Sequence, residues 1–269
     1  MDPAQAIEAS QLDLFWLPEH VETRVRAELC CLRSDEPVFH YNAAVRCHPA
    51  PGDTVALVRE ISEWHKGGCS RVHLYPSNRS AALERALTDQ GYRATFEHSA
   101  MAVDVTEYVV RPSPGIVVRR VETLEQLVDC VEVLREALGV TPPTSDEAWQ
   151  EQLRNCTGDL ARTHRYVAYD EASRRPLSSG GLNLYPDLGL GHLWGGGTVP
   201  TGRRRGAYSA VVAARVAAAR ALSLRYVGLF ARHGESSPIV TKQGFQAHGR
   251  MSTWDRSIER SQTLFASTT

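Results

Sequence analysis

The stretch from Gly195 to Phe245 constrains the fold of this chain more than any other. A glycine run, Gly195–Gly197, leads into a loop rich in glycine and arginine, and an alanine-rich run and a short apolar run follow. This order predicts strand, loop, helix, strand and helix. No Ser, Asp or Asn stands beside the first turn of the first helix, so its backbone N–H groups lack side-chain caps. Such a helix end, with its positive dipole, suits a phosphate or pyrophosphate.

Composition limits the classes of protein to consider. The chain has 269 residues, 42% of them apolar, which is enough for one large or two ordinary domains. The 30 Lys and Arg nearly balance the 31 Asp and Glu, so the chain lacks the charge excess of a dedicated nucleic-acid binder. The cysteines form no C-x-x-C pair and the histidines no metal-binding spacing, so we expect reduced thiols, no metal and a cytoplasmic protein.

The hydropathy pattern predicts neither secretion nor membrane spanning. Residues 1–20 are acidic and lack the basic-then-apolar order of a signal peptide. The longest apolar run is interrupted by Arg215 and Arg220. We therefore expect a globular protein without a membrane partner.

The first part of the chain predicts alternating helices and strands. Residues 2–33 read as helix in two pieces broken near Pro18, because apolar residues recur at helical spacing. After them we expect strand at 38–45, helix at 54–65, strand at 71–75, helix at 78–90 and strands at 95–105.

A proline-rich segment then divides the chain. Pro112 and Pro114 suit an extended, non-helical connection. We therefore predict, in chain order, a first domain at residues 1–108, a linker at 109–114, a second domain at 115–260 and a C-terminal tail at 261–269.

The second domain predicts strands with helices between and after them. Thr123 with Gln126 forms a capping-box pattern before a helix that ends at Leu138, and a second helix is expected at 146–154. Strands are expected at 116–120, 165–170, 177–185 and 189–199. This order indicates an α/β or α+β fold.

Two stretches of the chain repeat one another. Residues 49–91 and 200–244 each contain helix, strand and helix before a glycine that precedes an aromatic residue. Only the second copy suits a pyrophosphate, because Pro49 and Pro51 remove amide donors where the first copy would need them. We therefore expect the N-terminal copy to be degenerate and structural.

At these residues the chain resembles the Gcn5-related N-acetyltransferase (GNAT) family. The family signature is Arg/Gln-x-x-Gly-x-Gly/Ala after a strand, and here Arg203–Tyr208 follows residues 198–200. Tyr208 stands where the family commonly has Gly or Ala. Residues 237–245 resemble the family's last helix and its Gly-Phe pair. The resemblance covers residues 115–256, and the N-terminal part resembles the fold by element order.

The resemblance implies two GNAT-like domains, each a mixed, mostly antiparallel sheet flanked by helices. It also implies that acetyl-CoA or another acyl-CoA binds as co-substrate, with its pyrophosphate on the amides of the signature loop and its pantetheine arm along the preceding strand. The residues expected to contact this cofactor are Gly197, Thr198, Val199, Arg203, Arg204, Arg205, Gly206, Ala207, Tyr208, Ser209 and Ser237. A P-loop is excluded, because Gly202 is followed by arginines and not by Lys-Ser/Thr.

The residues that would carry the chemistry are less clearly marked. Acyl transfer to an amine needs a base for the ammonium proton and an acid for the leaving thiolate. Many family members carry a tyrosine as that acid four positions before the Gly of Gly-Phe, where this chain has Val240. The candidates near the expected cleft are Ser236, Ser237, His233, Glu235, His192 and Trp194. Ser237 before Pro238 also fits a helix N-cap, and a water relay stays open.

The sequence thus predicts a GNAT-type N-acyltransferase, most simply an N-acetyltransferase. It would move an acyl group from acyl-CoA directly to the amine of a small molecule. Two alternatives stay open: a non-catalytic acyl-CoA-binding or regulatory protein, consistent with Val240, and an acyltransferase whose donor is a carrier protein or an aminoacyl-tRNA. The acceptor, the acyl chain and the oligomeric state are not determined by the sequence.

Overall fold

The computed structural model describes residues 1–66, 68–158 and 161–257. Contacts divide the chain into unit 1, made of Met1–Ser10 with Ala100–His248, and unit 2, made of Gln11–Ser99 with the chain from Gly249 onward. The predicted linker at 109–114 falls inside unit 1, where residues 109–113 have neither helix nor strand. The division into domains at that linker stays a prediction.

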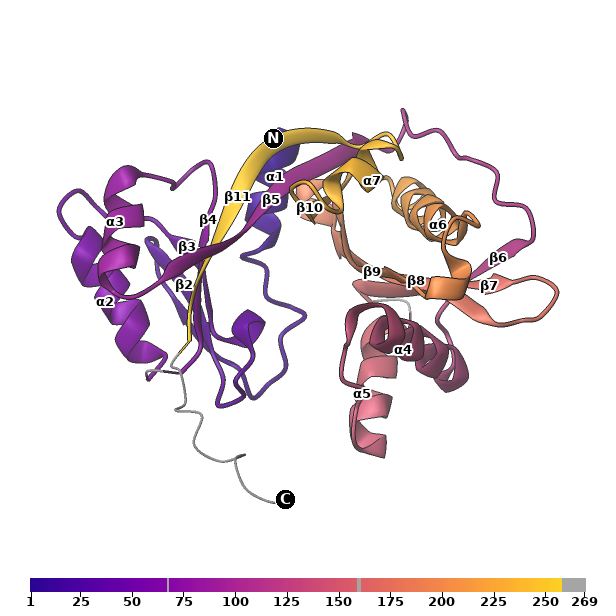
Figure 1. Ribbon diagram of the computed structural model, residues 1–269, viewed down its shortest axis with the longest axis horizontal. Helices are drawn as coiled ribbons and strands as arrows, with labels where there is room; N and C mark the ends of the chain where they lie inside the picture. The colour runs from indigo at the N-terminus through magenta and orange to yellow at the C-terminus, as the bar shows by residue number, and fades with distance from the viewer. Residues whose placement is uncertain (67, 159–160, 258–269) are drawn as a thin grey trace, which may run out of the picture. The chain divides into compact units, whose positions relative to one another are not determined.

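Unit 1 is a mixed sheet with helices on both of its faces. Its strands lie in the order β5-β10-β9-β8-β7-β6; β6 to β9 pair antiparallel and β10 runs parallel to β9. Figure 1 shows α6 on one face of this sheet and α4 and α5 on the other. The elements are α1 (Pro3–Ser10), β5 (Arg93–Asp104), β6 (Ile116–Arg120), α4 (Leu124–Leu138), α5 (Asp146–Cys156), β7 (Thr163–Asp170), β8 (Pro176–Tyr185), β9 (Leu190–Thr198), α6 (Ala207–Ala221), β10 (Tyr226–Arg232) and α7 (Ser237–Thr241), with 3-10 turns at Pro186–Leu188 and Pro200–Gly202.

The ends of α4 follow from local sequence. Thr123 Oγ1 accepts the Gln126 amide at 3.3 Å, and Gln126 Oε1 accepts the Thr123 amide at 3.2 Å, which confirms the predicted capping box. The helix ends at Gly139, whose φ of 72° is a left-handed conformation that glycine adopts without strain.

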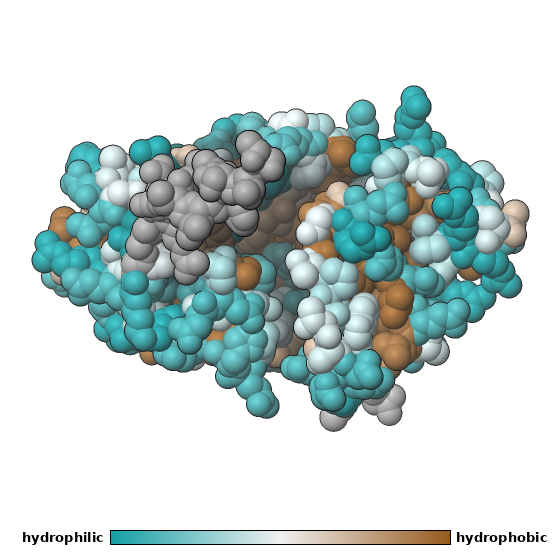
Figure 2. All heavy atoms as spheres, turned by 60° about the horizontal axis from the view of Figure 1, so that its bottom comes forward, coloured by the Kyte–Doolittle hydropathy of each residue, from teal (hydrophilic) through white to brown (hydrophobic). Residues whose placement is uncertain are grey.

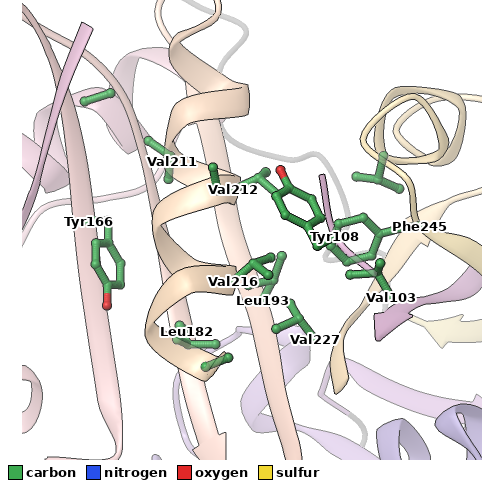
Figure 3. Close-up of a cluster of buried hydrophobic side chains, with 14 of the residues drawn as sticks. Val103, Tyr108, Tyr166, Leu182, Leu193, Val211, Val212, Val216, Val227 and Phe245 are labelled. Carbon is green, nitrogen blue, oxygen red and sulfur yellow. The ribbon is translucent and has the colours of Figure 1, made fainter. Parts of the chain in front are cut away.

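The main core of unit 1 lies between α6 and the sheet. Val211, Val212 and Val216 of α6 belong to one buried cluster with Leu182 of β8 and Leu193 of β9, and Figure 3 shows Val216 next to Leu193. All five side chains are buried. Each contributes roughly 1.5–3 kcal/mol by leaving water, so packing against the sheet, more than helix propensity, holds α6 in place.

Unit 2 contains the remaining strands and two helices. Its strands lie in the order β1-β2-β3-β4-β11-β5, and β3 runs parallel to β4. Its remaining elements are β1 (Glu22–Val25), β2 (Leu29–Arg33), β3 (Ala43–Cys47), α2 (Thr54–Trp64), β4 (Ser70–Leu74), α3 (Ala81–Asp89) and β11 (Gln246–Arg256), with a 3-10 turn at Phe39–Tyr41. The strands β5 and β11 each begin in one unit and end in the other.

The prediction of helix across residues 2–33 was wrong beyond Ser10. After α1 the chain forms β1 and β2, and the four residues Leu29–Leu32 are all buried. A short apolar run buried on both sides does not distinguish strand from helix by its spacing. The strand predicted at 38–45 is present only from Ala43, in β3, because a 3-10 turn at Phe39–Tyr41 precedes it.

The outer face of α4 carries exposed apolar side chains. They are Leu124, Val128 and Leu138 of the helix and Val140 after it. Figure 2 shows patches of hydrophobic surface, in brown, among hydrophilic residues on the side where α4 and α5 lie. Among the described helices, none combines the length and the apolar character needed to cross a membrane.

Candidate functional site

A cavity of about 430 Å³ lies in unit 1 beside the N-terminus of α6, within the size range of small-molecule sites. It is lined by Ala137, Leu138, Gly196, Gly197, Thr198, Gly202, Arg203, Arg204, Gly206, Ala207, Tyr208, Ser209, Ser236, Ile239 and Gln243. Eight of the eleven residues predicted to bind the cofactor therefore line it. The other three, Val199, Arg205 and Ser237, lie outside the lining set.

The N-terminus of α6 faces this cavity without side-chain caps. Gly206 precedes the helix at a φ of 82° and offers no side chain. The amides of Ala207, Tyr208 and Ser209 have no acceptor among the described residues, because the first bond into the helix is made by the Ala210 amide to Gly206 O. Three N–H groups and the positive end of the helix dipole are thus available to an anion.

The three arginines of the loop have different surroundings. Arg203 and Arg204 are exposed and line the cavity, and Arg204 has a positive φ of 61°. Arg205 instead forms an ion pair with Asp170. The Ser173 amide, and then the Arg205 guanidinium, hold the pKa of the Asp170 carboxyl well below its usual range. Arg203 and Arg204 are therefore the arginines placed to meet a bound anion.

The glycine run of β9 forms a bulge and lets neighbouring groups approach closely. Between two ladder pairs β8 has one residue, Gly180, whereas β9 has Gly195 and Gly196, and Gly195 has a φ of 56°. A Cβ on Gly196 would lie 3.0 Å from the Tyr208 ring, and a Cβ on Gly197 would lie 2.9 Å from a carbon of α4. A side chain at either glycine would therefore crowd the groups that form the wall of the cavity.

Strands β9 and β10 separate in the middle of β9. Three parallel pairs join them, namely Tyr226 with Leu190, Val227 with Gly191 and Gly228 with His192. Among the described strands, residues 193–198 pair with β8 only. The N–H and C=O groups on the other edge of this segment are left to an extended ligand, which can add there like a strand.

Comparison with known proteins rests on structure. No family model matches this chain, and no curated protein matches it in sequence. A GCN5-related N-acetyltransferase from Kribbella flavida has a TM-score of 0.69 at 15% identity, covering 94% of this chain and 95% of that chain. A second from Sphaerobacter thermophilus has a TM-score of 0.62 at 18% identity, covering 88% and 75%.

A third match is a tandem GNAT protein from the clavulanic acid biosynthesis pathway, with a TM-score of 0.61 at 11% identity, covering 95% of this chain and 89% of that chain. The fold is that of the GCN5-related N-acetyltransferases. Because these matches span most of the chain and one is a tandem protein, the predicted tandem-like GNAT fold is confirmed.

The residues predicted to do GNAT chemistry are spread over unit 1. Ser236 lines the cavity, whereas His233 and Glu235 are exposed outside its lining, with Glu235 Oε2 3.4 Å from Arg232 Nη1. His192 lies at the last β9–β10 pair, where burial lowers its pKa to about 4. The N-cap position before α7 belongs to Ser236, without a side-chain hydrogen bond, and not to Ser237.

Sequence reasoning missed several lining residues. Ile239 and Gln243 are four positions apart, in α7 and just after it, a spacing that could have indicated a shared face. Ala137 and Leu138 come from the end of α4, and no local pattern links that helix to the loop. Within the described part of the chain no three His, Cys, Asp or Glu side chains are grouped to hold a metal, and a metal-free site stays a prediction.

Proposed function

We propose that this chain is a GNAT-type N-acyltransferase, most simply an N-acetyltransferase, that transfers an acyl group from acyl-CoA directly to the amine of a small molecule. The observation that carries the proposal is the open edge of β9 beside the uncapped N-terminus of α6 in one cavity. An extended pantetheine arm would pair with residues 193–198, and a pyrophosphate would accept hydrogen bonds from Ala207 to Ser209. Arg203 and Arg204 would add favourable charge.

Bound acyl-CoA supplies a thioester, whose carbonyl carbon forms a bond to the amine nitrogen while its bond to sulfur breaks. The ring of His192 is neutral near pH 7 because burial lowers its pKa to about 4. The same shift makes the ring a weak base for an ammonium proton, so that proton would leave through a water relay. Ser10 Oγ lies 3.2 Å from His192 Nδ1 and orients the ring. Ser236 offers a hydroxyl proton to the leaving thiolate directly or through water, whereas Val240 is fully buried and has none to give.

Calorimetry tests the donor site directly. Acetyl-CoA and longer acyl-CoA thioesters are titrated into the protein, beside acetyl-pantetheine, which lacks the pyrophosphate. We expect binding of at least one acyl-CoA and at least about 10-fold weaker binding of acetyl-pantetheine, because charged hydrogen bonds to the α6 amides are lost. A folded protein that binds none of these thioesters would refute the proposal.

Val240 favours a second candidate, a non-catalytic acyl-CoA-binding or regulatory protein. It stands at the position of the family's tyrosine and has no exposed surface. This alternative predicts acyl-CoA binding with no release of free thiol across a broad panel of amines. Thiol release above the protein-free rate would exclude it.

A donor attached to a carrier protein or a tRNA is favoured by a different observation. Arg203 and Arg204 are exposed at the cavity and could contact a macromolecule that carries the acyl group. In that case Arg203→Glu would weaken binding of the macromolecular donor more than binding of free CoA. Equal losses for both ligands would favour acyl-CoA as the donor.

The proposal also covers the tandem arrangement and the location of the protein. In unit 2, β3, α2, β4 and α3 lead to Gly91 and a buried Tyr92, as β9, α6, β10 and α7 lead to Gly244 and a buried Phe245. The first strands of each set are parallel neighbours, β3 with β4 and β9 with β10. These features support a degenerate N-terminal copy, and the six free cysteines support a cytoplasmic location.

A further inference from the structure

Two rows of polar residues cross the face of β7, β8 and β9 on the side of α4. The sheet register places Arg165, Gly181 and Trp194 in one row. Thr163, Asn183 and His192 form the next row, two residues along each strand, or roughly 7 Å away. Trp194 belongs to the segment of β9 that no longer pairs with β10, so this face borders the predicted acyl-donor site.

The first row holds a guanidinium without a counter-charge. Arg165 is partly buried, and in the described part of the chain its Nε is buried without a hydrogen-bond partner and no carboxylate pairs with it. Its guanidinium carbon lies 5.1 Å from the centre of the Trp194 ring. The neighbouring Cys130 thiol stays neutral because burial raises its pKa. A partly buried cation without a counter-charge is stabilised when an anionic ligand binds to it.

Hydrogen bonds hold the groups around Arg165 in place, and the amide nitrogen of Asn183 is left as a second donor. Trp194 Nε1 donates to Asn183 Oδ1 at 2.8 Å, and Thr163 Oγ1 donates to the same oxygen at 3.1 Å. The Asn183 amide nitrogen has no acceptor among the described residues. The indole ring lies where a side chain of Gly181 would be, since a Cβ there would approach it to 2.1 Å. The ring is thus held between glycine and guanidinium.

We propose that the acceptor amine carries a carboxylate and that Arg165, assisted by Asn183, binds this carboxylate. The planar fork of a guanidinium matches the two oxygens of a carboxylate, and its single positive charge balances the single negative charge of the carboxylate. His192 lies in the adjacent row of the same face. The substrate class is therefore an amino acid or a similar amino-carboxylic acid. This inference rests on the proposed acyl transfer and deepens it.

Matched acceptors test the preference. Each amino acid of a panel is compared with the amine that lacks its carboxylate, and acyl transfer is followed by thiol release. We expect kcat/KM to favour the amino acid by about 10- to 100-fold, through KM more than kcat. Arg165→Gln should remove this preference, and Arg165→Lys should keep part of it. Arg154→Gln, an exposed charge change on α5, should leave it intact. Acetyl-CoA affinity should be unchanged in all three variants.

A binding measurement keeps the test independent of activity. The protein is labelled with 5-fluorotryptophan, and the Trp194 signal among the five tryptophans is identified by its loss in Trp194→Phe. We expect the amino acid, and not its decarboxylated partner, to shift this signal in the wild type but not in Arg165→Gln. No shift with any amino acid, or equal shifts in Arg165→Gln, would overturn the inference even if acetyl-CoA binds. Failure to bind acetyl-CoA would overturn the proposed function separately.

Discussion

Replacing Gly181 by alanine should destabilise unit 1 through a single contact. The new Cβ would lie 2.1, 2.3 and 2.6 Å from three atoms of the Trp194 indole. Ordinary carbon contacts are about 3.5–4.0 Å, so the ring must move by more than an ångström. That movement breaks its 2.8 Å hydrogen bond to Asn183 and disturbs its contact with the Arg165 guanidinium.

The cost has two parts. Overpacking a filled site costs about 1–3 kcal/mol. The lost hydrogen bond adds about 1 kcal/mol. The free energy of unfolding of Gly181→Ala should therefore fall by about 2–4 kcal/mol, which urea unfolding followed by circular dichroism measures as a lower midpoint at constant slope.

A double-mutant cycle decides whether the ring is the cause. In a Trp194→Ala background the space beside position 181 is empty, so Gly181→Ala should cost less than about 0.5 kcal/mol. A cost that is the same in both backgrounds would refute the reasoning and place the strain in the backbone. Where the variant stays folded, acetyl-CoA affinity should be retained, because residue 181 does not line the donor cavity.

Three further predictions follow from the same structure. Arg203→Glu should weaken acetyl-CoA binding about 10-fold or more in calorimetry. Arg85→Glu, which reverses the charge of an exposed arginine in unit 2, should leave this binding unchanged. Equal acetyl-CoA affinities in the two variants would contradict the role of the loop. The pKa of His192 lies near 4 in the fold and about 6.5 in an unfolded chain, so its contribution to stability is present above pH 6.5 and is lost as the pH falls toward 4. His192→Gln should flatten that part of a plot of urea midpoint against pH, and an unchanged slope would argue against burial of the ring. Thr123→Ala should lower the free energy of unfolding by about 1 kcal/mol through loss of the capping box, and an unchanged midpoint would show that α4 does not depend on it.

Features set by neighbouring residues could be predicted from the sequence. The capping box at Thr123, the left-handed glycine at Gly206 and the uncapped start of α6 all depend on a few consecutive residues. The donor side of the site follows from them, because loop, helix start and preceding strand are continuous in the chain. This is why most of the residues predicted for the cofactor line one cavity.

Features that depend on strand register or on burial in the tertiary structure could not be predicted from the sequence. Arg165 and Trp194 are 29 positions apart in the sequence and meet only because β7, β8 and β9 pair in one register. Arg215 interrupts the apolar run of α6 and reads as a surface residue, yet it is 1% exposed and donates to Gly181 O at 3.0 Å. Side-chain burial of this kind depends on the sheet that the helix covers, which no local pattern encodes.

The two strands that begin in one unit and end in the other have a consequence for synthesis. Unit 1 includes Met1–Ser10 and the end of β5 from Ala100, but it lacks its part of β11 until His248 has been made. Unit 2 lacks β11 until residue 256 has been made. Neither unit can therefore complete its sheet on the ribosome while much of the chain is still missing, unlike domains that fold one after another. Cutting the gene at residues 109–114 would leave each fragment without strands that its own sheet requires.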